Sequence, residues 1–141
     1  MRIKNLLLII LTCLTLGACG NDALWDEMPA PISKFVSTYY PMSGVSSYSE
    51  SNGIYSVTVT NGATITFDSD YQWLTINGNG QTLPEIFVEN EFEPKLIQYL
   101  TALQLTDSVY AAQNDPREVI VSVTNYKIRY EKSTGDISEV K

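Results

Sequence analysis

A five-residue motif that occurs twice sets the strongest limit on what this chain can fold into. Val-Thr-Val-Thr-Asn at residues 57–61 and Val-Ser-Val-Thr-Asn at residues 121–125 differ at one position and lie 64 residues apart. Each copy lies in a run where apolar and polar residues alternate and a turn follows, the pattern of a β-hairpin with one buried face. The sequence therefore predicts an internal duplication with an antiparallel hairpin in each copy.

Both predicted hairpins place their apolar side chains on one face. In the first, Asn61-Gly62 forms the turn, residues 73–76 add a further strand, and the apolar face carries Tyr55, Val57, Val59, Ile65 and Phe67. In the second, Val109-Tyr110 begins the strands, Asn125-Tyr126 forms the turn, and the apolar face carries Val119, Val121, Val123, Ile128 and Tyr130. The opposite faces are polar and include Ser56, Thr58, Thr60, Thr64, Thr66, Ser122, Thr124, Lys127 and Arg129.

An amphipathic helix is predicted before each hairpin. Apolar residues recur at the i, i+3, i+4 and i+7 spacing of a single helix face, after prolines suited to a first helical turn. These stripes are Ile32, Phe35, Val36 and Tyr39 in the first copy, which Pro41 ends, and Leu96, Tyr99, Leu100 and Leu103 in the second, which Pro94 opens. Met28-Pro29 and Leu83-Pro84 are offset by 55 residues, which indicates that the second copy has gained residues in its helical part.

A hairpin alone is marginally stable, so each must bury its apolar face against its helix and the other copy. We therefore predict an α+β fold, a tandem repeat of helix plus antiparallel β-sheet units, with residues 29–78 and 79–141 as the two units.

The first residues have the pattern of a lipoprotein export signal. Arg2 and Lys4 precede an apolar run over residues 6–16, which is too short to span a bilayer comfortably, and Leu16-Gly17-Ala18-Cys19 supplies small residues beside a cysteine. We expect residues 1–18 to be removed, Cys19 to be lipidated and residues 19–28 to form a tether. Two or more acyl chains anchor a protein stably, which predicts a place in the cell envelope, on the periplasmic side or the surface, with the outer membrane favoured. The alternative is an ordinary secretory signal.

Composition excludes several functions. The net charge is −7, and it becomes −9 when Arg2 and Lys4 leave with the signal, which argues against nucleic acid as a partner. The sequence has no histidine, and removal of Cys13 and lipidation of Cys19 leave no free thiol, so a histidine-based triad or a usual zinc site is excluded. No glycine-rich phosphate loop is present. We expect a non-enzymatic protein without a cofactor.

The motif order resembles a known family. Met28-Pro29, Tyr40-Pro41, the hairpin from Tyr55 to Asp68, and Trp73, followed by a second copy, are similar to the PepSY-like, beta-lactamase-inhibitor-protein-like family of bacterial envelope lipoproteins over about residues 24–138. The resemblance implies tandem units with helical structure packed on an antiparallel sheet. Two positions depart from the family pattern. The glycine usual after the Phe-Asp turn is missing near Asp70-Tyr71, and Leu105-Thr106 replaces the second aromatic-Pro pair.

The polar hairpin faces either meet solvent or bind a partner. In the family that this chain resembles, the sheet face opposite the helices is where an inhibitor-type protein would meet its partner. The candidate partner-binding residues are Thr58, Thr64, Thr66, Tyr71, Trp73, Lys127 and Arg129.

We expect a lipid-anchored envelope protein that binds a protein or peptide. One alternative is an inhibitor of an envelope hydrolase or protease that inserts the loop at Asp70-Tyr71. Another is a carbohydrate-binding lipoprotein, which would need exposed coplanar aromatic rings beside hydroxyls. Asp68 and Asp70 could bind calcium or simply form a solvated turn.

Overall fold

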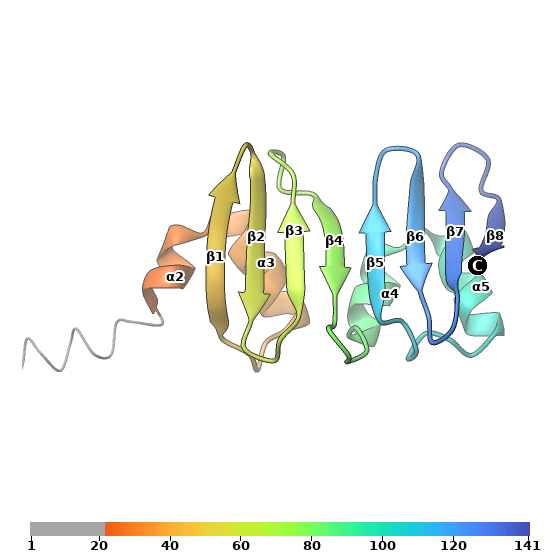
Figure 1. Ribbon diagram of the computed structural model, residues 1–141, viewed down its shortest axis with the longest axis horizontal. Coiled ribbons are helices and arrows are strands. Elements are labelled where there is room, and N and C mark those ends of the chain that lie inside the picture. The colour runs from red at the N-terminus through yellow and green to blue at the C-terminus, as the bar shows by residue number, and fades with distance from the viewer. Residues whose placement is uncertain (1–21) are drawn as a thin grey trace, which may run out of the picture.

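The computed structural model describes residues 22–141 as two helix-plus-sheet halves that share one antiparallel sheet. The sheet has eight strands in the order β1-β2-β3-β4-β5-β6-β7-β8, so every strand pairs with its neighbours in sequence. Figure 1 shows α3, α4 and α5 behind the sheet and no helix in front of it. The predicted fold class, α+β with tandem helix-plus-antiparallel-sheet units, is confirmed.

The first half contains two helices and four strands. They are α2 (Asp22–Glu27), α3 (Ala30–Tyr39), β1 (Val45–Ser51), β2 (Ile54–Val59), β3 (Thr64–Phe67) and β4 (Trp73–Asn77). The predicted apolar stripe lies on α3. The helix ends at Tyr39 because Tyr40, the residue before Pro41, disfavours helical geometry. Part of the predicted tether is ordered, since α2 lies against the edge strand β1 (Figure 1). None of the helices within residues 22–141 is long and apolar enough to cross a membrane.

The second half also contains two helices and four strands, and both of its helices follow the Leu-Pro pair. It consists of α4 (Glu85–Glu91), α5 (Pro94–Ala102), β5 (Ala111–Asn114), β6 (Glu118–Ser122), β7 (Lys127–Glu131) and β8 (Ile137–Val140). Pro29 and Pro84 precede α3 and α4 with nearly the same backbone angles, φ/ψ of −55°/144° and −57°/135°. The residues gained in the second copy are thus accommodated by a break at residues 92–93 and a second helix.

The core lies between the sheet and the helices. Val57 and Val121, the equivalent positions of the repeated motif, are 1% and 0% exposed. At the junction of the halves, the ring of Phe87 on α4 packs edge-on against rings of the first half, with centroids 5.5 Å from Tyr39 and 5.1 Å from Trp73. The two sequence repeats therefore share a single core.

Two elements of the second half, α4 and β8, were not predicted, and a third, β5, begins later than predicted. α4 carries only two buried residues, Phe87 and Val88, too few to make a helical stripe in the sequence. β8 is a short edge strand in which no residue is fully buried. The predicted start of the second set of strands at Val109 precedes the observed β5, which begins at Ala111.

Candidate interaction surface

The sheet face opposite the helices carries five of the seven predicted partner-binding residues. Residues paired across antiparallel strands point to the same side, and the pairs Thr58↔Thr64 and Thr66↔Thr75 alternate with the buried pair Val57↔Ile65. In the second half, Ser122↔Lys127 and Ile120↔Arg129 alternate with Val121↔Ile128 in the same way. We call this surface the open face.

The first-half part of the open face is covered by short polar side chains. In the described strands β1–β4, the paired residues of this face are Ser47, Ser49, Ser51, Ile54, Ser56, Thr58, Thr64, Thr66, Thr75 and Asn77. None of these carries a charge, and the hydroxyl oxygens of Thr66 and Thr75 lie 2.6 Å apart in a hydrogen bond. This half of the surface is therefore uncharged and rich in hydroxyl groups, with Ile54 as its one exposed large apolar side chain among these residues.

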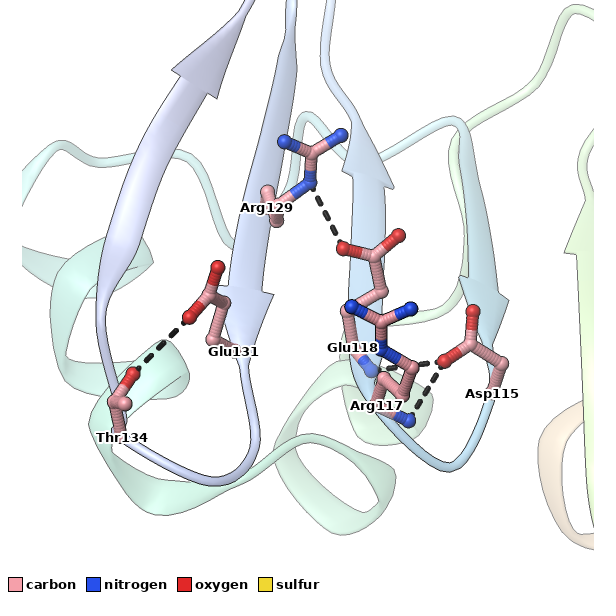
Figure 2. A network of polar contacts seen from close by, with 6 residues as sticks. All are labelled: Asp115, Arg117, Glu118, Arg129, Glu131 and Thr134. Atoms are coloured by element: carbon pink, nitrogen blue, oxygen red, sulfur yellow. Dashed lines mark hydrogen bonds and ion pairs between the residues drawn. The ribbon is translucent and has the colours of Figure 1, made fainter.

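The second-half part of the open face is charged. Figure 2 shows Arg129 on β7 beside Glu118 on β6, with 2.9 Å between Nε and Oε2 and side chains that are 39% and 28% exposed. The contact is an ion pair rather than a hydrogen bond, because the buried Nε has no hydrogen-bond partner within the described chain. The terminal nitrogens of Arg129 point away from Glu118 in Figure 2. Lys127 is exposed two residues before Arg129 on the same face.

The turn beside this ion pair is held by a carboxylate. Asp115 accepts hydrogen bonds from the backbone N–H groups of Arg117 and Glu118, at 2.7 and 2.9 Å (Figure 2). These backbone bonds favour the charged form and lower the pKa of Asp115. The β5–β6 turn therefore fixes the position of Glu118, the ion-pair partner of Arg129, at the start of β6.

The two halves are joined by backbone pairing between β4 and β5 and by side-chain hydrogen bonds beyond these pairs. Three residue pairs join β4 to β5, from Thr75↔Gln113 to Asn77↔Ala111. Beyond them, Asn114 Nδ2 donates to the backbone oxygen of Trp73 at 3.1 Å, and Lys132 Nζ donates to Asn114 Oδ1 at 2.6 Å. The open face is thus continuous across the two repeats.

The remaining two candidates, Tyr71 and Trp73, do not lie on the open face. Trp73 is 5% exposed and its ring packs against Phe87 and Phe92, which makes it a core residue. Tyr71 lies in the β3–β4 turn and its ring packs 5.4 Å from that of Tyr55, which shares the helix side of the sheet with Phe67. Strand alternation assigns sides only within a strand, so the sequence could not predict on which side of the sheet the turn residue Tyr71 lies.

The carboxylate of Asp68 organises the β3–β4 turn. Its Oδ1 accepts hydrogen bonds from the backbone N–H groups of Asp70 and Gln72, both at 2.9 Å, as expected of a turn aspartate. Within residues 22–141, no three His, Cys, Asp or Glu side chains are grouped so that they could hold a metal ion. Cys19, the predicted lipidation site, lies outside the described residues.

The solved structures similar to this chain include proteins of Bacteroides. A DUF2874-family protein of Bacteroides vulgatus, inferred to be periplasmic, superposes with a TM-score of 0.67 at 18% identity, over 83% of this chain and 93% of that one. A protein of Bacteroides thetaiotaomicron, inferred to be periplasmic and calcium-regulated, gives 0.64 at 20% identity, over 81% and 92%. These similarities establish the shared fold.

A BLIP-like protein of Bacteroides fragilis is also matched, over 79% of this chain and 84% of that one, at 14% identity and a TM-score of 0.33. No family model and no curated protein matches the sequence. At the level of the fold, the resemblance seen in the sequence is confirmed: the chain has the architecture of the DUF2874-type proteins.

Proposed function

We propose that this chain is a non-enzymatic, lipid-anchored protein of the cell envelope that binds a protein partner on the open face of its sheet. The observation that supports this most directly is an eight-stranded sheet with helices on one side only. An antiparallel sheet can leave one face in solvent or use it to bind a partner, and here the uncovered face has a charged half and an uncharged half, which favours binding.

The shape and chemistry of the open face favour a macromolecule. Small-molecule sites are concave and mostly apolar, whereas this surface presents hydroxyls next to the cations of Lys127 and Arg129 and the carboxylates of Glu118 and Glu131. Lys127 and the outward nitrogens of Arg129 would pair with carboxylates of the partner, while the Thr58 and Thr64 region would accept a flat polar surface. The narrower alternative, an inhibitor of an envelope hydrolase, would add contacts from the loop at Tyr71.

The location rests on the N-terminal pattern and on similarity. The Leu-Gly-Ala-Cys sequence before the folded part favours lipid attachment at Cys19. Two structural relatives are inferred to be periplasmic, which is compatible with export. A Cys19→Ser variant should lose incorporation of a labelled fatty acid and leave the membrane fraction. Unchanged labelling would contradict the anchor.

Site-specific photocrosslinking in intact cells tests the binding face. A photoreactive amino acid at Thr64 or Lys127 should crosslink to one defined protein, while the same group at the exposed Ser37 on α3 should not. The triple variant Thr58→Glu, Lys127→Glu, Arg129→Glu should remain folded and lose that crosslink. Equal crosslinking from Ser37, or full retention of the partner by the folded triple variant, would remove the open face from consideration.

A further inference from the structure

Three partly exposed tyrosines form an aromatic cluster at the border of the core, on the helix side of the sheet near its β1 edge. Tyr48 on β1 and Tyr55 on β2 have ring planes 14° apart with centroids separated by 6.4 Å. Tyr71 from the β3–β4 turn packs against Tyr55 with centroids 5.4 Å apart. The aromatic rings at the centre of the core are fully or almost fully buried, whereas each of these three keeps part of its surface in solvent. We call Tyr48, Tyr55 and Tyr71 the tyrosine cluster.

Tyr71 is held in the cluster at a conformational cost. Its φ is 64°, in the left-handed region, which is an outlier for a bulky aromatic residue and unfavourable by roughly 1–2 kcal/mol. The turn enforces this conformation, because the Tyr71 N–H donates to the Asp68 backbone oxygen at 3.0 Å and Asp68 Oδ1 holds the N–H groups on either side. A glycine would adopt this conformation without strain, so the ring of Tyr71 is present at a position where the backbone favours glycine.

A carboxylate lies beside the cluster. Glu50 lies directly opposite Tyr55 across β1 and β2, on the same side of the sheet, and its Oε1 accepts a hydrogen bond from the Gly53 N–H at 3.1 Å. Burial, and then the charges of Glu50 and Glu27 together with Tyr71, raise the pKa of Tyr48. The neighbouring phenol of Tyr71 is the main cause of the raised pKa of Tyr55. The raised pKa keeps the phenols of Tyr48 and Tyr55 neutral, and the surface combines aromatic rings with the negative charge of Glu50.

We infer that the tyrosine cluster and Glu50 form a binding site for a cationic side chain of a partner protein, an arginine guanidinium above all. A cation is attracted to the faces of aromatic rings, and a planar guanidinium both stacks on a ring and pairs with a carboxylate. This site lies on the opposite side of the sheet from the open face and does not depend on it.

NMR of the full lipidated chain in phosphatidylcholine nanodiscs, with ¹³C-labelled tyrosine rings, tests the inference. The peptide acetyl-Gly-Arg-Gly-amide should shift the signals of Tyr48, Tyr55 and Tyr71 saturably. The same peptide with citrulline, which keeps the shape and loses the charge, should bind at least about threefold more weakly, since the cation–π term is lost. Equal binding of the two peptides, or no saturable shift with the arginine peptide, would overturn the proposal.

Variants separate the site from general effects. Glu50→Gln should weaken the arginine peptide, while Glu93→Gln, which removes an exposed carboxylate before α5, should not. Tyr71→Gly should abolish the shifts of Tyr48 and Tyr55 while the protein stays folded, because glycine suits the backbone there. Retained binding in the folded Tyr71→Gly protein would contradict the site. Ring shifts produced by maltotriose but not by the arginine peptide would replace the cation site with a carbohydrate platform.

Discussion

The phenol of Tyr39 on α3 donates a hydrogen bond to Oε1 of Glu91 on α4, with 2.5 Å between the oxygens, and so ties the helices of the two halves together. Tyr39 is 6% exposed, and its pKa lies well above its usual value because of burial first and the Glu91 carboxylate second. The residues are 52 positions apart in sequence. The bond closes the helical layer over the aromatic rings at the junction.

A double-mutant cycle should detect this link. Tyr39→Phe and Glu91→Gln should each reduce the free energy of unfolding, with a coupling of roughly 1–3 kcal/mol, as for other hydrogen bonds to charged groups. Urea denaturation of the two single variants and the double variant measures it. Glu89→Gln on the exposed side of α4 is the control and should change stability by less than about 0.5 kcal/mol. Strict additivity of the two changes would mean that the contact contributes nothing.

Tyr40 should make the protein sensitive to alkaline pH. Its hydroxyl is buried without a hydrogen-bond partner in the described residues, and burial raises its pKa to about 12. The pKa of Tyr40 is higher in the folded state than in the unfolded state, so folding favours the neutral phenol. The stability that depends on the neutral phenol is fully present below about pH 10 and falls by roughly 2 kcal/mol as the pH rises through 12. Urea denaturation across this range measures the loss, and Tyr40→Phe should make it smaller.

Tyr40→Phe should also be neutral or stabilising near pH 7. The substitution removes a buried polar group that makes no hydrogen bond and preserves the ring. A gain of up to about 1 kcal/mol is expected by thermal or urea denaturation. A clear loss at neutral pH would show that the hydroxyl has a partner.

Gly78, which follows β4 at the junction of the halves, should not tolerate a side chain. A Cβ at this position would lie 1.8 Å from the backbone oxygen of Gln81, and the Gly78 N–H donates to the Tyr110 oxygen at 2.9 Å. Because the obstacle is backbone, Gly78→Ala should destabilise the protein by at least about 2 kcal/mol. At Gly44 the nearest atom would be a Thr60 methyl carbon at 3.4 Å, so Gly44→Ala should have little effect. Equal melting temperatures for the two variants would refute this argument.

The repeated motif predicts equal roles for equivalent valines. Val57→Ala and Val121→Ala should each lower the free energy of unfolding by about 2–3 kcal/mol, because both side chains are buried in the shared core. Thr58→Ala, on the neighbouring residue of the same strand, should change it by no more than about 0.5 kcal/mol because the side chain faces the open side. Chemical denaturation compares the three. A loss at Thr58 as large as that at Val57 would mean that something covers the open face.

The local sequence determined the repeated units and the sides of the strands. Apolar alternation in residues 55–59 and 119–123 predicts which side chains face the helices, since neighbouring residues of a strand point to opposite sides. The stripes that contain Ile32 and Leu100 predict α3 and α5 in the same way, because one face of a helix recurs every three to four residues. For this reason the sequence assigned five polar candidates to one face of the sheet: Thr58, Thr64, Thr66, Lys127 and Arg129.

Tertiary packing decided what local pattern does not contain. α4 contributes two buried side chains, Phe87 and Val88, and the ring of Phe87 packs against Tyr39 of the first half, a contact that exists only once both repeats are in place. Trp73 and Tyr71 are two residues apart, yet one is buried in the core and the other joins a partly exposed cluster. A hydrogen-bonded turn sets the direction of Tyr71, and no periodicity describes a turn. The open face exists for a similar reason, since strand alternation defines two sides and only the placement of the helices determines which side they leave uncovered.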